Sequence, residues 1–562
     1  MVIIMNSKRK IIIDDLHSMI IKDDSFEVYS GQWRLFNFLV HSRLNLKEQT
    51  DTAEKVSLVS IDQNDGLKVI WQAENSLWDK KKYVLKLKDN TLCYHIEVEG
   101  NGAPENIEYF RGGESVNGSE FSVAGYLNVN SQNLDKERSK FMIDTAGSIE
   151  GYEFKGALLP LRAAPPPFVF PFWNDYNDDT VYVGLAAEKG KHNFERFVIK
   201  APRVGWQKTG ISFVVPLKSY TEINGSWKSP YILIGFGKND MDAIKNYSQW
   251  QYDNLNFKKH ITKENAPLWW KGPMFCGWGA QCSLRLKTGL KSPDHAAEYY
   301  YNGFLNKVDS IGLNPSLVMI DDKWQKEYGT LEVDTNKWPD LRAFTDKQHA
   351  KGRKVLLWFK LWDAEGVPED ECIMLDGKKY CVDPTNPKYL KRLKERIHAL
   401  LSSDAGSYNC DGFKLDFMDL NPRMEGAVAY EKGVYGLEMM KRLFHNVYLI
   451  SKEVKSDCLI NMSSVHPYFA EDCDQYRVHD YDMSLRSPIS VIKFRCEFAN
   501  AVMPEVLIDT DGSVGTNKNE TLFTYLQMPK LGVPDLYDLP DDFMDEDWAE
   551  LKKAWDDYRK TL

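Results

Sequence analysis

The stretch NCDGFKLDFMDL (residues 409–420) combines an apolar run of strand type with charges at alternate positions. Side chains two positions apart in a strand point to the same side, so Lys414 and Asp416 share one face. Burying a charge inside a strand is costly unless the charge has a partner. The stretch therefore predicts a strand whose carboxyl end presents Asp416 to other polar groups.

Strand and helix patterns alternate on both sides of this stretch, from about residue 265 onward. Apolar runs predict eight strands, at residues 273–281, 315–324, 353–362, 411–417, 458–464, 475–480, 505–512 and 532–539. Eight strand–helix units in about 290 residues are the number and size of a (β/α)8 barrel. An open doubly wound sheet is the alternative, but no glycine-rich phosphate-binding turn follows any of these strands.

The first half of the chain follows a different pattern, in which short alternating segments are separated by turn residues. Examples are GLKVIWQA (66–73), KKYVLKLKD (81–89) and TLCYHIEVEG (91–100). This pattern predicts an antiparallel β-sandwich domain at residues 1–262, ahead of a barrel domain at 263–562. The proline-rich segment 161–178 is expected to form a loop tipped by Phe172 and Trp173. The short tail after the eighth strand leaves little room for a sizeable C-terminal β-domain.

The composition is that of an ordinary globular protein, with 43% hydrophobic and 27% charged residues in a chain of 562. A formal net charge of −10 argues against nucleic acid or an anionic membrane as a partner. No apolar run reaches the length of a transmembrane helix, and the N-terminus does not resemble a signal peptide. Nine cysteines without CxxC pairs are typical of reduced thiols. We therefore expect a cytoplasmic protein, and a periplasmic or secreted form with its leader removed is the alternative. Whether the protein forms a homo-oligomer stays open.

Polar and aromatic residues collect at the carboxyl ends of the predicted strands, where the active sites of such barrels lie. The residues at these ends are Trp278, Asp321, Asp322, Trp324, Trp358, Lys360, Trp362, Lys414, Asp416, Ser463, Ser464, Arg477, Asp480, Asp482, Asp509 and Asp511. Carboxylates and cations bind sugar hydroxyls through charge-assisted hydrogen bonds, and indole faces cover the apolar side of a sugar ring. Glycoside cleavage also needs one ionised and one protonated carboxyl group. Lys414 is expected to lower the pKa of Asp416 and keep it ionised.

Three of these strand ends resemble motifs of the clan D α-glycosidases, which include glycoside hydrolase families 36, 27 and 31. DGFKLDF is similar to the K-x-D motif of strand four, and MIDDKWQ to the DDGWQ segment of family 36, with Lys323 in place of glycine. RVHD is similar to the R-x-S-D segment of the raffinose-synthase-like branch, with His479 in place of serine. The segments GRKVLLWFKLW and DGKKYCVDPTNP also resemble the clan, the second more as in family 31.

The resemblance implies a retaining exo-α-glycosidase, α-galactosidase-like, that uses neither a metal nor an organic cofactor. Asp416 would be the nucleophile and Asp480 the acid/base, with Asp482 as the alternative for the second role. A retaining pair of carboxyl groups lies about 5–5.5 Å apart. Asp419 lies beyond the strand end and is expected to be a loop or helix-cap residue.

The predicted substrate contacts surround these two carboxyl groups. They are Asp321, Asp322, Trp324, Lys414, Arg477, Trp278, Trp358, Lys360 and Asp482. The resemblance implies that the aspartates and Lys414 bind sugar hydroxyls and that Arg477 lies near the acid/base. Asp322 is favoured over Asp321, because adjacent residues of a strand face opposite ways. Each tryptophan is equally well explained by packing in the core.

Other activities remain open at this point. A clan D enzyme could instead act on an α-glucoside, an α-xyloside, an N-acetylgalactosaminide or an anionic sugar, and Lys323 could recognise an anionic group or neutralise the aspartates. A transglycosylase would pass the sugar to a carbohydrate acceptor rather than to water. A catalytically inactive carbohydrate-binding protein is the alternative from another class. In every case the expected partner is an oligosaccharide or glycoside.

Overall fold

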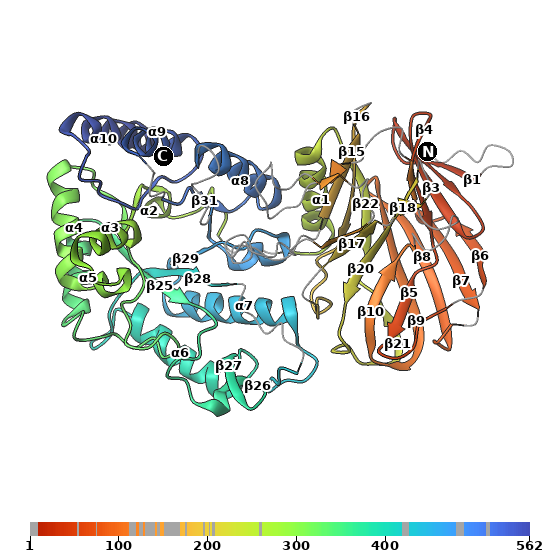
Figure 1. Cartoon of the computed structure of the whole chain (residues 1–562), viewed down its shortest axis with the longest axis horizontal. Helices are drawn as coiled ribbons and strands as arrows, with labels where there is room; N and C mark the ends of the chain where they lie inside the picture. Colours follow the sequence, from red (N-terminus) through yellow and green to blue (C-terminus); the bar gives the residue numbers. More distant parts are fainter. Residues whose placement is uncertain are drawn as a thin grey trace. The chain divides into compact units, whose positions relative to one another are not determined.

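A computed structural model of the whole chain shows two compact units (Figure 1). The structure describes residues 9–562 except 53–54, 75, 112–119, 123–127, 130–140, 143–146, 151–168, 175–176, 195–196, 202, 205–207, 258–260, 419–425, 479–487 and 513–516. Unit 1 comprises Met1–Gly156, Pro166–Phe257 and Lys432–Glu438. Unit 2 comprises Ala157–Pro165, Lys258–Glu431 and Met439–Leu562.

Unit 1 is built from three antiparallel sheets. One has the order β1 (Arg9–Ile12), β2 (His17–Ile21), β3 (Ser25–Ser30), β4 (Trp33–Leu39), β11 (Glu120–Ser122), β19 (Lys208–Gly210) and β18 (Arg203–Val204). The second has the order β14 (Gly147–Glu150), β17 (Val198–Ala201), β20 (Ser212–Pro216), β10 (Pro104–Tyr109) and β5 (Arg43–Leu46). The third has the order β13 (Phe141–Met142), β12 (Asn128–Val129), β15 (Val169–Asn174), β16 (Asn177–Leu185), β22 (Ile232–Gly237), β9 (Thr91–Gly102), β8 (Lys80–Lys88), β7 (Leu67–Glu74) and β6 (Lys55–Asp62), with β21 (Ile223–Lys228) also paired to β9. This antiparallel architecture confirms the predicted sandwich class.

The expectation of a loop at residues 161–178 is wrong over its C-terminal part. Val169–Asn174 forms β15, which pairs with β16 and carries Phe172 buried within the unit. Among the described pairings, β12 meets β15 only at Phe172 and Trp173, so Pro171 has a neighbouring strand on one side only. A proline is tolerated at such a position, because its missing N–H is not needed by a second strand.

One long helix, α1 (Asp240–Asn254), covers part of the third sheet, although the sequence pattern of this half predicts almost no helix. Asn239 caps the helix by accepting a hydrogen bond from the backbone N–H of Asp242. Gly237 ends β22, and a Cβ atom there would lie 2.3 Å from the backbone nitrogen of Ala243. Only glycine allows the helix to turn back so closely onto its strand.

Unit 2 is an eight-stranded parallel barrel, which confirms the predicted fold class. Its strands follow the order β31 (Leu507–Asp509), β30 (Gln475–Arg477), β29 (Leu459–Met462), β28 (Gly412–Asp416), β25 (Lys354–Lys360), β24 (Leu317–Ile320), β23 (Met274–Cys276) and β32 (Asp535–Leu536). A parallel bridge between Asp509 of β31 and Val533, just before β32, joins the two ends of this strand order and closes the barrel. Order in space therefore follows order in sequence.

Helices surround these strands (Figure 1). They are α2 (Leu268–Lys271), α3 (Trp278–Thr288), α4 (Glu298–Ile311), α5 (Leu341–Ala350), α6 (Pro387–Leu401), α7 (Gly436–Val454), α8 (Pro488–Val502), α9 (Lys518–Gln527) and α10 (Asp545–Arg559). Short 3-10 turns lie at Ser292–His295, Glu369–Glu371, Pro467–Asp472 and Met528–Lys530, and a hairpin of β26 (Cys372–Leu375) and β27 (Lys378–Val382) follows β25. Across the described residues, no helix has the length and apolarity that a membrane crossing requires.

The strand that carries Asp416 starts with a glycine for a steric reason. Gly412 has φ of 149°, and a Cβ atom at this position would lie 2.0 Å from the carbonyl oxygen of Leu459 in the neighbouring strand. The absent side chain lets β28 and β29 approach each other at the base of the barrel. The strand then alternates inward Lys414 and Asp416 with buried Phe413 and Leu415.

Candidate active site

The carboxylate of Asp416 lies at the end of β28 and is held by groups from two other strands. Trp358 donates its indole N–H to Oδ2 over 3.0 Å, and Arg477 donates from Nη2 to Oδ1 over 3.1 Å. The side chain of Asp416 is 21% exposed, whereas that of Arg477 is 2% exposed. Charge-assisted bonds of this kind stabilise the ionised carboxylate. The arrangement leaves an oriented, partly accessible anion at the barrel mouth.

Arg477 is itself oriented by a second carboxylate. Its Nη1 donates to Oδ2 of Asp511 over 3.3 Å. Asp511 follows β31 with φ of 53°, and its backbone N–H donates to Oδ1 of Asp509 over 2.9 Å. Asp511 stood in the sequence only as one of many acids near strand ends, so its role in orienting Arg477 emerges from the structure.

Lys414 does not bond to Asp416, contrary to what their spacing suggests. Its ammonium group donates to Oδ2 of Asp321 over 2.7 Å and to the hydroxyl of Tyr537 over 2.9 Å, and lies 3.4 Å from Sγ of Cys276. Burial disfavours the charged form, but Asp321 outweighs that cost and raises the pKa of Lys414 above its usual range. Lys414 and Asp321 thus form a buried ion pair one layer below Asp416, with side-chain exposures of 3% and 4%.

Asp322 has a different bonding partner from Asp321 and is more exposed. Its Oδ1 accepts a hydrogen bond from the hydroxyl of Tyr328 over 2.8 Å. Burial, together with the negative charges of Asp321 and Asp416, raises the pKa of Asp322 to about 6, although the bond from Tyr328 opposes this shift. Tyr328 was not singled out from the sequence, because it lies in a loop outside any recognised motif.

Two lysines flank the ring of Tyr328. The ammonium group of Lys323 lies 4.1 Å from the ring centre and that of Lys360 lies 4.4 Å from it, distances typical of cation–π contacts. Lys323 also pairs with Glu365 over 2.9 Å, and Lys360 with Asp363 over 2.7 Å. Both lysines are therefore neutralised by acids of the loop after β25.

The tryptophans of the predicted site differ in accessibility. Trp324 is fully buried and donates its indole N–H to the backbone oxygen of Trp358 over 2.7 Å, which is a packing role. Trp358 is 2% exposed and orients Asp416 through its N–H. Trp362 is buried and donates to the backbone oxygen of Met418 over 3.0 Å. Trp278 is partly buried, begins α3 and packs against the barrel core.

Asp480 and Asp482, the candidates for the acid/base, lie outside the described residues, as do Asp419 and His479. The separation of about 5–5.5 Å expected between the two catalytic carboxyl groups therefore stays a prediction. The strand that leads to them ends at Arg477, next to Asp416. The predicted acid/base segment therefore follows directly after the carboxyl end of a barrel strand, the end at which Asp416 lies.

Two further acids lie deeper in the barrel. Burial and the charge of Asp511 raise the pKa of Asp509 to about 7, and Asn461 donates to its Oδ2 over 2.8 Å. Burial and the charge of Asp509 raise the pKa of Asp535 well above its usual range. Within the described part of the chain, neither carboxyl oxygen of Asp535 has a hydrogen-bond partner. Protonation removes the cost of burying a second negative charge there.

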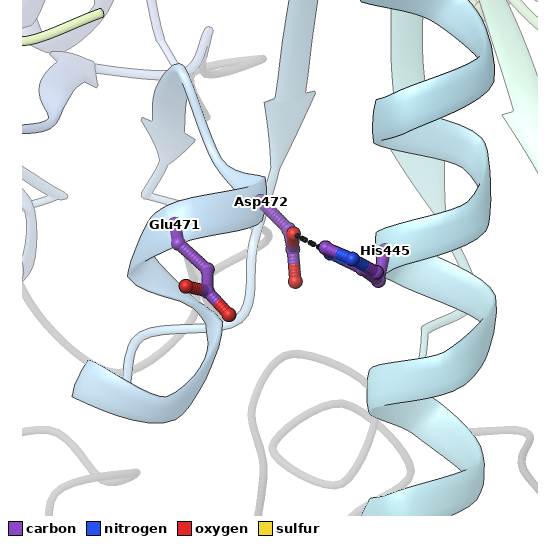
Figure 2. Close-up of side chains that lie close together, drawn as sticks. All are labelled: His445, Glu471 and Asp472. Carbon is purple, nitrogen blue, oxygen red and sulfur yellow. Dashed lines mark hydrogen bonds and ion pairs between the residues drawn. The ribbon is translucent and has the colours of Figure 1, made fainter. Parts of the chain in front are cut away.

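One cluster in the described residues has the spacing of metal ligands. His445, Glu471 and Asp472 place one ligand atom each within 4.8 Å of one another, and His445 bonds to Asp472 over 2.8 Å (Figure 2). The ammonium group of Lys441 lies 2.7 Å from Glu471 and 2.5 Å from Asp472. Both carboxylates are already paired within the chain, with Lys441 and, for Asp472, also with His445, so the cluster is explained as an ion-pair network.

No protein-family model and no curated protein sequence matches the chain. Solved structures do match it. The ligand-free α-N-acetylgalactosaminidase NagBb from Bifidobacterium bifidum is 12% identical, with a TM-score of 0.63 over 98% of this chain and 93% of that one. A GH31 family sulfoquinovosidase from E. rectale is 11% identical, with a TM-score of 0.60 over 96% of this chain and 82% of that one. The GH36 α-galactosidase AgaA from Geobacillus stearothermophilus is 9% identical, with a TM-score of 0.54 over 92% and 75%. The chain thus shares the fold of these clan D glycosidase structures.

Proposed function

We propose that the protein is a retaining exo-α-glycosidase, α-galactosidase-like, that releases a terminal α-linked sugar from a small oligosaccharide or glycoside. The observation that carries this proposal is the oriented carboxylate of Asp416, bonded to Trp358 and Arg477 at the end of the fourth barrel strand. A nucleophile has to be ionised, held in position and accessible. The bonds from Trp358 and Arg477 favour the ionised form and fix its direction, and the side chain is 21% exposed, which supports this role. The fold shared with glycosidases adds support by analogy.

The proposed reaction is a double displacement. An oxygen of Asp416 attacks the anomeric carbon, the glycosidic C–O bond breaks, and Asp480 gives its proton to the leaving oxygen. A covalent glycosyl-enzyme results. Asp480 then removes a proton from water, the water oxygen attacks the anomeric carbon, and Asp416 leaves as a carboxylate. Asp482 is the alternative acid/base.

Asp322 is the proposed contact for a hydroxyl group of the bound sugar. Its Oδ1 is held by Tyr328, and Oδ2 has no hydrogen-bond partner among the described residues. Asp321 and Lys414 neutralise each other below the site, so we assign them to shaping it. Lys323 is paired with Glu365, and Lys360 with Asp363. Because their positive charges are already balanced, these lysines do not attract an anionic sugar, which supports a neutral substrate.

A panel of aryl α-glycosides tests this proposal. It comprises the galactoside, N-acetylgalactosaminide, glucoside, xyloside and sulfoquinovoside. We expect release of the aryl group from the galactoside or another neutral glycoside, with retention at the anomeric centre. Transfer to an added sugar in preference to water would identify a transglycosylase. Binding without turnover across the whole panel would identify a carbohydrate-binding protein instead.

We further propose a reducing compartment such as the cytoplasm. All nine cysteines, each within the described residues, are thiols rather than halves of disulfides, and eight of them are buried. Free buried thiols persist in reducing surroundings. Labelling of thiols in the unfolded protein from its native host, before and after reduction, tests this directly, and a gain of reactive thiols on reduction would contradict it.

A further inference from the structure

A hollow of about 290 Å³ opens on unit 1, far along the chain from the barrel residues discussed above. It lies between the tight turn that joins β8 to β9 and the exposed side of α1. Its deepest lining residues, Thr91, Tyr182, Phe236 and Trp250, are buried. The hollow lies within one compact unit, so its shape does not depend on how the two units are arranged.

One wall of the hollow is held rigid by a histidine. His17 bonds through Nδ1 to Asp14 and through Nε2 to Asp179, each over 2.8 Å. Its ring stacks on Phe236 with the centres 3.5 Å apart and the planes 11° from parallel. Burial opposes protonation, but the two carboxylates raise the pKa of His17 and keep the three groups together. Asp14 and Phe236 are thus fixed before any ligand arrives.

The floor is aromatic, and its polar atoms are already satisfied. Trp250 donates its indole N–H to the backbone oxygen of Lys88 over 3.2 Å. The hydroxyl groups of Tyr182 and Thr91 bond to each other over 3.1 Å. What remains for a ligand is therefore the small area of ring carbon that Phe236 and Trp250 expose at the floor, which suits a molecule with an apolar face.

The rim carries acceptors that point to a donor-rich ligand. The turn between β8 and β9 consists of Asp89 and Asn90, which have φ of 50° and 56°. Asn254 donates a hydrogen bond to Oδ2 of Asp89 over 3.1 Å. Gln249 donates to Oδ1 of Asp253 over 2.9 Å. Among the described residues, Oδ1 of Asp89, Oδ2 of Asp253 and Oε1 of Gln249 have no such partner. A ligand that fits here donates hydrogen bonds from several directions.

Two classes of ligand are excluded by the lining. Three aspartates and no lysine or arginine line the hollow, which disfavours any anion. Among the described residues, the only trio of metal-ligand atoms within 4.8 Å of one another lies elsewhere, at His445, so these carboxylates are too dispersed to hold a metal ion.

A sugar ring has donating hydroxyl groups around its edge and an apolar face. We propose that the hollow is a second saccharide-binding site that takes one neutral sugar residue.

A direct test uses the full chain with Asp416→Asn, labelled with 5-fluorotryptophan, and follows the ¹⁹F resonance that disappears in Trp250→Phe. The probes are the methyl glycosides of galactose, glucose and N-acetylgalactosamine, with galactosamine and tetramethylammonium as cationic comparisons. We expect a saturable shift of the Trp250 resonance with at least one neutral glycoside. In Gln249→Ala/Asp253→Ala the affinity should fall by about tenfold, a change of about 1.4 kcal/mol.

The matched control is Gln72→Ala/Glu74→Ala, which likewise removes one glutamine and one acidic side chain, from exposed positions on β7. It should leave the titration unchanged. No saturable shift up to about 100 mM of any neutral glycoside overturns the proposal, since sugar sites of this size bind in the millimolar range. A response to tetramethylammonium alone also overturns it and indicates a cation site. Because the measurement is of binding at Trp250, it is independent of whether the barrel is catalytically active.

Discussion

The hydroxyl of Tyr328 donates a hydrogen bond to Oδ1 of Asp322 over 2.8 Å, and two lysines flank the ring of the same tyrosine. This contact leaves Oδ2 of Asp322 to meet a ligand. It also stabilises the ionised form of Asp322, against the burial and negative neighbours that raise its pKa. Tyr328 thus controls both the direction and the charge of the proposed sugar-binding carboxylate.

Tyr328→Phe should weaken substrate binding more than it slows the chemical step. Removing a hydrogen bond to a charged group costs about 1.5–3 kcal/mol, so we expect KM to rise by about tenfold or more while kcat changes little. The measurement is steady-state kinetics on the best aryl glycoside of the panel. Tyr299→Phe is the control, because Tyr299 is 82% exposed. A fall of kcat by about tenfold with an unchanged KM would contradict a role in binding.

The pH dependence of kcat/KM should reflect Asp322. Its pKa is raised to about 6, so the carboxylate becomes protonated as the pH falls through that value and can no longer act as a full acceptor. We expect an acidic limb near pH 6 that disappears in Asp322→Asn. In Tyr328→Phe the limb should move to higher pH, because the tyrosine bond lowers the pKa. A limb that is unaltered by both substitutions would assign the titration to another group.

Asp416→Gly should abolish turnover and be rescued by external azide with formation of a β-glycosyl azide. The small side chain leaves space for azide on the face from which the carboxylate attacks. The product is identified by NMR of its anomeric proton. Asp419→Asn, three residues on, serves as the control and should keep most of the activity. Failure of rescue at every azide concentration would remove Asp416 from the nucleophile role.

Asp480→Asn should slow the hydrolysis of glycosides with poor leaving groups far more than those with activated aryl groups. A poor leaving group needs its proton in the transition state, whereas an activated one departs without it. The ratio of kcat/KM values for an alkyl and a nitrophenyl glycoside measures this effect. Asp482→Asn is the matched comparison. If the pattern appears in Asp482→Asn instead, the acid/base role belongs to Asp482.

Lys414→Met should destabilise the barrel strongly, because it leaves the carboxylate of Asp321 buried without a cation. Breaking a buried pair from one side costs about 3–5 kcal/mol, and adding Asp321→Asn should recover part of that loss. Chemical denaturation monitored by circular dichroism measures the change. Lys394→Met breaks an exposed pair with Glu453 and should cost less than about 1 kcal/mol. Equal stabilities of the two variants would contradict the importance of the buried pair.

Much of the barrel was predictable because its strands are buried on both sides and appear as apolar runs. The strands at Leu317–Ile320, Lys354–Lys360 and Gly412–Asp416 lie within the ranges that their apolar runs predicted. The β15 strand was missed, since prolines suppress the strand pattern and only its one-sided pairing makes Pro171 acceptable there.

The sequence by itself determined the order of strands and helices and the set of polar residues at the carboxyl ends, because alternation and apolar periodicity are local properties. It could not determine which of these residues meet. Lys414 bonds to Asp321, which is 93 positions away, and not to Asp416 two positions on. Arg477, 61 positions away, takes the place beside Asp416. The closed barrel decides these pairs. Its geometry sets the height of each residue along the barrel axis, and only side chains at similar heights can reach one another across the interior.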